Sequence, residues 1–86
     1  MLEEMGDSIE AVAARLKAAR EALGLSKREF AEMADMGEQT YGPFELAARP
    51  LSLIAAKKLR KAHGLTLEFL YFGSKLDLPH RIAAKL

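Results

Sequence analysis

The chain has 86 residues, of which 50% are hydrophobic and 29% are charged, with no cysteine and a formal net charge of +1. This length suits one domain rather than two, and the composition is that of a folded globule rather than of a disordered chain. Without cysteine there is neither a disulfide framework nor a thiolate metal site, and His63 and His80 do not form a metal-ligand motif. We therefore expect no metal and no cofactor.

The charges are divided unevenly along the chain. The first ten residues carry a charge of −4 and the remainder +5. The start lacks the basic and apolar regions of a signal peptide, and no apolar run approaches the roughly 20 residues of a membrane span. We therefore expect a cytoplasmic protein with no membrane segment, in which a flexible acidic N-terminus at 1–7 precedes a basic folded part.

The first predicted helix covers about residues 8–23. A capping oxygen at Asp7 precedes Glu10 by three residues, and Gly24 supplies a left-handed residue that ends the helix. Apolar residues recur at spacings of four, three and four, at Val12, Leu16, Ala19 and Leu23. The other faces are expected to carry the charged residues Arg15, Lys17, Arg20 and Glu21. The pattern predicts an amphipathic helix with one buried side.

Residues 26–45 contain the signals of two short helices joined by a tight turn. Ser26 and Glu29 form a capping box that opens a predicted helix at about 27–34. In the following turn, Asp35 and Gly37 both tolerate a positive φ. The helix predicted at 38–45 then points Tyr41 and Phe44 inward. The sequence therefore predicts a helix-turn-helix over 26–45.

Two more helices and a short tail follow. Ser52 caps a helix that Gly64 ends, and Thr66 caps another that Gly73 ends. Their expected core positions are Leu53, Ile54, Ala56, Leu59, Ala62, Leu67, Leu70 and Tyr71. No strand pattern occurs. We therefore expect an all-α fold with a five-helix domain at 8–73 and an amphipathic C-terminal tail at 74–86 that contains a short additional helix.

Residues 15–33 (RLKAAREALGLSKREFAEM) resemble the opening of the Xre-type, phage-repressor-like helix-turn-helix family. Residues 50–53 (PLSL), 58–59 (KL) and 64–73 (GLTLEFLYFG) resemble its fourth and fifth helices. The resemblance covers about residues 12–73. It implies a lambda-repressor-like DNA-binding domain that regulates transcription, with double-stranded DNA as its partner.

The resemblance also implies which residues meet DNA, because the second helix of the motif enters the major groove in this family. The implied base contacts are Glu38, Gln39 and Thr40. The implied phosphate contacts are Ser26, Lys27, Arg28 and Arg49. Glutamine can pair with adenine, threonine with a thymine methyl group, and glutamate with the amino group of cytosine. The alternative is that these side chains only cover a solvated surface. A further implication is a structural salt bridge between Arg20 and Glu45.

Three residues depart from the family pattern. Pro43, preceded by Gly42, removes a backbone hydrogen bond and is expected to kink or shorten the helix after Tyr41. Asp35 stands where the family prefers glycine. Glu38 suits the helix dipole but repels phosphate, and the predicted helix 38–45 has no lysine or arginine.

The tail at 74–86 has an apolar stripe that consists of Leu76, Leu78, Ile82 and Leu86. Two interpretations are open, namely that the tail helps to form a homodimer or that it packs back on the first helix. A homodimer would add the phosphate contacts of two copies on two half-sites.

For function, the sequence favours a repressor-like transcriptional regulator of phage or bacterial type that occupies operator DNA as a homodimer. The alternative is a protein-interaction module, such as an antirepressor or an antitoxin, that keeps the helical scaffold with weak or no DNA binding. An enzyme is not expected, because no catalytic constellation or phosphate-binding loop is present, and no small-molecule substrate is indicated.

Overall fold

Six helices follow one another in the computed structural model, which describes residues 8–86, and no strand occurs in that range. The helices are α1 (Ile9–Ala22), α2 (Lys27–Met33), α3 (Glu38–Glu45), α4 (Leu53–His63), α5 (Leu67–Phe72) and α6 (His80–Ala83). The all-α prediction is therefore confirmed, with the first three helices within one residue of their expected bounds. The predicted acidic segment 1–7 lies outside the described residues.

Side-chain caps set where four of these helices begin. The hydroxyl groups of Ser8, Ser26, Ser52 and Thr66 each accept a hydrogen bond from the backbone N–H three residues later, at 3.0 to 3.1 Å. Such a bond satisfies one of the N–H groups that have no partner within a helix. The cap of α1 is thus Ser8, one residue after the aspartate that the sequence suggested.

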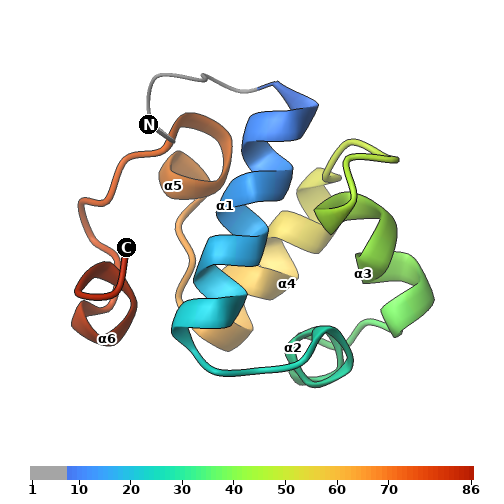
Figure 1. Ribbon diagram of the computed structural model, residues 1–86, viewed down its shortest axis with the longest axis horizontal. Coiled ribbons are helices and arrows are strands. Elements are labelled where there is room, and N and C mark those ends of the chain that lie inside the picture. Colours follow the sequence, from blue (N-terminus) through green and yellow to red (C-terminus); the bar gives the residue numbers. More distant parts are fainter. Residues whose placement is uncertain (1–7) are drawn as a thin grey trace.

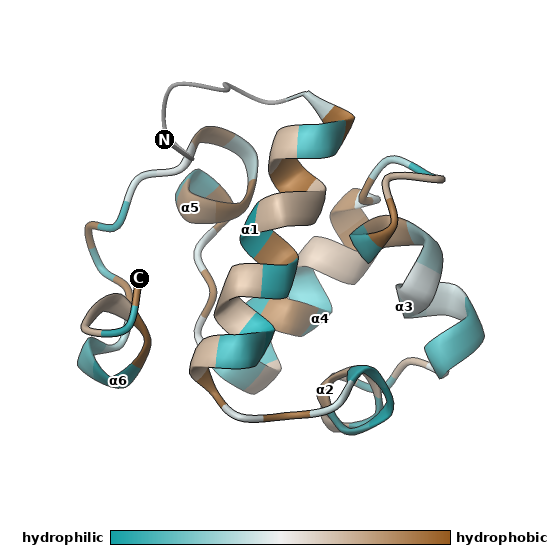
Figure 2. Ribbon diagram, in the orientation of Figure 1, coloured by the Kyte–Doolittle hydropathy of each residue, from teal (hydrophilic) through white to brown (hydrophobic). Residues whose placement is uncertain are grey.

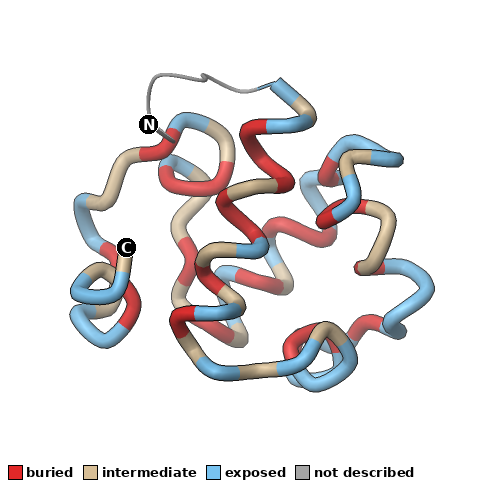
Figure 3. Tube along the Cα trace, viewed as in Figure 1, coloured by how far each residue is buried: buried red, intermediate tan, exposed pale blue. Residues whose placement is uncertain are grey.

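Helix α1 runs through the middle of the molecule (Figure 1). It packs against α3 on one side and against α5 and α6 on the other. Figure 3 shows that buried residues recur along its whole length, whereas α2 and the start of α3 are largely exposed. The largest apolar side chains that are fully buried are Tyr41, Phe30, Phe69, Leu16, Leu59, Leu65, Leu70 and Ile82.

The core corrects three sequence-based expectations. Arg15 is fully buried rather than on a solvent face, and its Nη1 donates to the backbone oxygen of Leu70 at 3.2 Å. Phe69 is fully buried, although no core position was expected there. Leu53 and Ile54 are exposed, because α4 buries a different side that contains Ala55, Ala56, Leu59 and His63. At about 100° per residue, Ile54 falls nearly opposite that side.

His63 attaches α2 to the rest of the domain. Its ring stacks on Phe30 with the centroids 4.2 Å apart and the planes 3° from parallel. Its Nε2 lies 2.9 Å from the backbone oxygen of Phe30. Since a carbonyl oxygen can only accept, this nitrogen carries the proton and donates. A histidine that is isolated in sequence therefore has a structural role, and it fixes α2 where the helix-turn-helix begins.

The C-terminal tail packs on its own domain. Ile82 of α6 is fully buried, Leu78 is buried, and Leu86 packs against the core. Helix α6 contacts α1, which agrees with the expectation that the tail packs back on the first helix. Leu76 is the exception, because 78% of its surface is exposed. Most of the apolar stripe of the tail is therefore used within one copy of the chain.

The packing of the tail predicts that Ile82→Ala destabilises the protein by about 3 kcal/mol, because it leaves a cavity in the core. Ile54→Ala removes the same side chain from an exposed position of α4, so it is the matched control and should change the free energy of unfolding by less than about 0.5 kcal/mol. Urea unfolding followed by circular dichroism measures both changes. Equal effects of the two substitutions would show that α6 does not pack as described.

Candidate nucleic-acid interface

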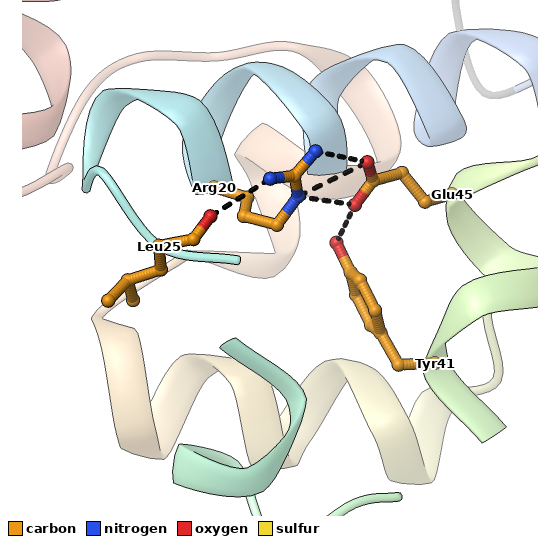
Figure 4. Close-up of polar contacts among 4 residues, drawn as sticks. All are labelled: Arg20, Leu25, Tyr41 and Glu45. Carbon is orange, nitrogen blue, oxygen red and sulfur yellow. Dashed lines mark hydrogen bonds and ion pairs between the residues drawn. The ribbon is translucent and has the colours of Figure 1, made fainter. Parts of the chain in front are cut away.

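Helix α3 is held in place by the carboxylate of Glu45 (Figure 4). Arg20 of α1 donates to it from Nε at 3.0 Å and from Nη2 at 2.8 Å. The hydroxyl of Tyr41 donates to the same carboxylate at 2.6 Å, and Arg20 Nη1 donates to the backbone oxygen of Leu25 at 2.9 Å. Only 13% of the Arg20 side chain and 2% of the Glu45 side chain are exposed. The salt bridge that the resemblance implied is therefore confirmed, and it joins α1, α3 and the loop before α2.

The network changes the acidity of its members. Burial, together with the bond to Glu45, raises the pKa of Tyr41 far above its ordinary value. Burial alone would also raise the pKa of Glu45, but the hydrogen bonds from Arg20 and Tyr41 and the charge of Arg20 outweigh it and hold this pKa below the ordinary value. Glu45 therefore remains a carboxylate that accepts from both partners at neutral pH.

Pro43 does not shorten α3, which continues as one helix from Glu38 to Glu45. Of the two expected effects, a kink or a shortened helix, shortening after Tyr41 does not occur. Proline removes one backbone bond, to the oxygen of Gln39, and the preceding residue is a glycine with no Cβ to clash with its ring. The bonds of Tyr41 and Glu45 and the burial of Phe44 fix the helix on both sides of this gap.

The turn between α2 and α3 depends on Asp35, whose φ is +56°. The left-handed conformation expected at this residue is therefore present, and aspartate enters it more readily than most residues. Gly37 does not adopt a positive φ, since it has a φ of −78° as the N-cap of α3. Lys58 of α4 donates from Nζ to the backbone oxygen of Asp35 at 3.1 Å. Helix α4 thus stabilises the turn between α2 and α3 through this hydrogen bond.

A groove between α2 and α3 brings together four of the seven predicted DNA contacts, namely Lys27, Arg28, Glu38 and Gln39. The other residues that line it are Glu32, Gly37, Gly42 and Leu46. The first turn of α3 is hydrophilic and exposed, as Figure 2 and Figure 3 show. A helix start that projects in this way is able to approach base edges in a major groove.

The three remaining candidates lie outside the lining of the groove. Thr40 is exposed on the first turn of α3. Ser26 uses its hydroxyl as the cap of α2, and its backbone N–H donates to Glu29 Oε1 at 2.9 Å. Arg49 is exposed in the loop after α3, where its backbone N–H donates to the oxygen of Pro43 at 3.2 Å. The structure thus gathers four of the seven candidates in the groove and leaves Ser26, Thr40 and Arg49 outside its lining.

Besides its two glycines, the groove contains two residues that the sequence-based prediction did not include, Glu32 and Leu46. Glu32 forms an exposed ion pair with Arg28, with Nε 3.2 Å from Oε2, and the spacing of four residues within α2 was a usable signal for it. Leu46, which is 68% exposed, follows α3 directly. No sequence signal placed it there, because an apolar residue after a helix is as readily buried as exposed.

The charge of this surface is unusual for a candidate DNA interface. Between residues 26 and 38 there are two cations, Lys27 and Arg28, and four carboxylates, on Glu29, Glu32, Asp35 and Glu38. This segment therefore carries a net charge of −2, although the whole chain is positive. DNA binding ordinarily depends on neutralising phosphates with lysine and arginine. Local attraction for the DNA backbone is consequently weak here.

Other kinds of site are not evident in residues 8–86. Over that range, no cluster of three or more His, Asp or Glu side chains is suited to a metal ion. None of the helices of the same range is both long and apolar enough to cross a membrane.

Comparison with known proteins identifies one family. A family model described as helix-turn-helix matches residues 16–70, which is more than half of the chain. The matched range begins within α1, ends within α5 and includes α2, α3 and α4 completely. No curated protein and no solved structure matches the chain.

The lowered pKa of Glu45 predicts how stability depends on pH. A carboxylate whose pKa is lower in the folded state stabilises the fold at every pH above its unfolded-state pKa of about 4.5. This stabilisation is lost as the pH falls through the folded-state pKa. We expect Glu45→Gln to lower the free energy of unfolding at pH 7 by about 3 kcal/mol, because Arg20 loses its buried partner.

Urea titrations of the wild type and the variant between neutral pH and the acid transition check this prediction. The difference in stability between them should shrink on acidification. Glu10→Gln, which removes an exposed carboxylate from α1, is the control and should follow the wild type. A difference between Glu45→Gln and the wild type that does not depend on pH would contradict the account of the network.

Proposed function

Because the chain belongs to the Xre-type, phage-repressor-like helix-turn-helix family, whose members are DNA-binding regulators, we propose that it is a sequence-specific transcriptional regulator. It acts in the cytoplasm as a repressor-like protein of phage or bacterial type, and it occupies operator DNA without chemistry. The observation that carries the proposal is the exposed first turn of α3, which shares a groove with the basic start of α2.

In the proposed complex the start of α3 lies in the major groove and reads bases. Gln39 is suited to adenine, because a side-chain amide can donate to N7 of this base and accept from its N6 amino group. Thr40, on the same turn, can bring its methyl group to that of a thymine. Glu38 can accept from an exocyclic amino group. The exposure of all three side chains supports this assignment.

Phosphate contacts are proposed at the start of α2 and after α3. Lys27 makes no ion pair with any described residue. Its charge helps to lower the pKa of Glu45, which indicates that the Lys27 side chain lies near α3. Arg28 can exchange its exposed pair with Glu32 for a phosphate, since such pairs contribute only a few tenths of a kcal/mol. Ser26 offers the capped start of α2, and Arg49 offers a loop cation that has no side-chain partner among the described residues.

We also propose that the regulator is a homodimer. Two copies on half-sites about 34 Å apart would double the phosphate contacts, which a reading surface without net positive charge needs. Phe72 at the end of α5 is 63% exposed, and Leu76 in the segment 74–86 follows four residues later. These two side chains are the proposed apolar part of the interface. Residues 8–73 form the helix-turn-helix domain in this proposal.

A second candidate function is binding of a protein instead of DNA, as an antirepressor or antitoxin does. Two features of the groove favour it: the charges of its lining cancel, with two cations and two carboxylates, and Leu46 in this lining is exposed. A third feature is the missing backbone bond at Pro43 within α3. A mixed apolar and charged groove is typical of a surface that takes a peptide or helix.

Salt dependence separates the two functions. We expect the protein to retard fragments of its own genome at low salt, with binding that weakens steeply as salt rises. Lys27→Ala should weaken binding to every fragment and lower the slope of log affinity against log salt by about 1, whereas Gln39→Ala should chiefly reduce the preference at one base pair, by about 1 to 3 kcal/mol. Titrations by fluorescence anisotropy measure both effects.

The matched control is Lys57→Ala, which removes an exposed cation from α4 outside the groove. It should leave the base preference and nearly all of the affinity intact. Failure of the wild type to bind any genomic fragment at low salt would refute DNA binding and favour the protein-binding candidate.

The proposed dimer is tested by Phe72→Ser combined with Leu76→Ser. Both side chains are exposed, so the fold should survive, while light scattering should show the mass of a dimer for the wild type and of a monomer for the variant. Leu46→Ser, which also polarises an exposed apolar side chain, is the control and should remain dimeric. If the double variant keeps the mass of the wild type, the interface lies elsewhere.

A further inference from the structure

The carboxylates of the α2–α3 groove differ in what they can do. Glu32 is paired with Arg28 at 3.2 Å, so its charge is locally compensated. Glu38 is the first residue of α3 and is exposed, and its side chain has no hydrogen bond or ion pair with any described residue. Its neighbours in the groove include Gln39 and Lys27. Glu38 is therefore an uncompensated negative charge at the tip of the proposed reading helix.

A carboxylate at this position interacts very differently with the two parts of a duplex. Phosphates repel it, and the repulsion is felt at every sequence. A carboxylate has only acceptors, and the donors that a base pair presents in the major groove are the amino groups of cytosine and adenine. Its charge is thus unfavourable everywhere on DNA except where such a donor meets it.

We infer that Glu38 is a specificity-determining residue that accepts from the amino group of a cytosine and lowers the affinity for all other DNA. This inference rests on the proposed DNA-binding function. Adenine presents the acceptor N7 beside its amino group, which repels a carboxylate, whereas cytosine presents only its amino donor, so cytosine is the base that suits Glu38. Discrimination then comes as much from repulsion at wrong sites as from attraction at the right one.

The rest of the surface is consistent with this role. The groove is lined by two cations and two carboxylates, so it has no net positive charge to offset the repulsion that Glu38 adds. Arg28 is partly occupied by Glu32, and Lys27 is the groove cation without an ion pair to a described residue. An operator can therefore be distinguished from bulk DNA with few strong contacts, because binding to bulk DNA is itself weakened.

The experiment compares Glu38→Gln with the wild type on three kinds of duplex. These are the genomic fragment that the wild type selects, a series in which each cytosine of that site is replaced in turn, and an unrelated duplex. Glu38→Gln keeps the shape and one acceptor but removes the charge. We expect it to bind the unrelated duplex about threefold more tightly. A good base contact gives a preference of about 5- to 150-fold for the right base. We expect the preference for cytosine at one position to be at least fivefold smaller in Glu38→Gln than in the wild type.

Two controls separate local from general effects. Glu68→Gln in α5 makes the same change of charge on an exposed residue outside the groove, and it should alter neither quantity. Glu32→Gln frees Arg28 within the groove, and it should tighten binding to all three kinds of duplex by a similar factor without changing base preference.

The possible failures are distinguishable. If the wild type binds no duplex at low salt, the proposed function itself is refuted and the inference with it. If the wild type binds but Glu38→Gln leaves the ratio of specific to unrelated affinity unchanged, the DNA-binding function stands and the role of Glu38 is refuted. If Glu38→Gln weakens binding to every duplex equally, Glu38 supports the fold or another contact, and the inference is also refuted.

Discussion

The carboxylate of Glu45 is the point at which three segments of the chain meet. It accepts from Arg20 of α1 and from Tyr41 within α3, while Arg20 also donates to the oxygen of Leu25 before α2. A buried charge is tolerable only when it is paired and hydrogen-bonded, so each of these groups requires the others. The orientation of α3 relative to α1 is therefore fixed by hydrogen bonds of defined direction, which apolar packing alone would not supply.

This constraint explains how α3 tolerates a proline. The interior of a short helix that relied only on its backbone bonds would be broken at Pro43. Here Tyr41 and Phe44 are buried, Glu45 is bonded, and the loop returns through the N–H of Ala48 to the oxygen of Pro43 at 2.9 Å. Tertiary contacts therefore hold the last turn of the helix in place. The first turn, from Glu38, is left free of such contacts and remains exposed.

The extent to which the sequence predicts the structure follows from the range of each interaction. Caps and turns are local, so Ser26, Ser52, Thr66 and the left-handed Asp35 are recognised directly. Burial on a helix is not local, since it depends on which neighbour covers each side. Arg15 resembles a solvent-facing residue until α5 offers it the oxygen of Leu70.

The same limit applies to the candidate interface. The residues at the starts of α2 and α3 are predictable, because the family pattern and the caps locate both helix starts. The presence of Leu46 in the groove and the compensation of Arg28 by Glu32 depend on side-chain positions. The spacing of four residues alone indicates only that the contact between Arg28 and Glu32 is possible. The electrostatic character of the surface therefore emerges from the structure more than from the motif.

The separation of charge has a consequence for how such a domain can bind DNA. Helix α4 carries four cations and no carboxylate, at Lys57, Lys58, Arg60 and Lys61, whereas residues 26–38 carry a net charge of −2. The field of α4 can attract DNA over a distance of about one Debye length, roughly 8 Å at physiological salt, but it does not orient the reading helix. In the proposed complex, orientation is left to a few contacts at the start of α2 and α3. A single domain with so few contacts binds weakly, and linking two of them makes the second binding event intramolecular, which raises overall affinity without any new contact per domain. Dimerisation, as proposed above, is therefore the physically simplest way for a helix-turn-helix whose groove has no net positive charge to gain affinity for DNA.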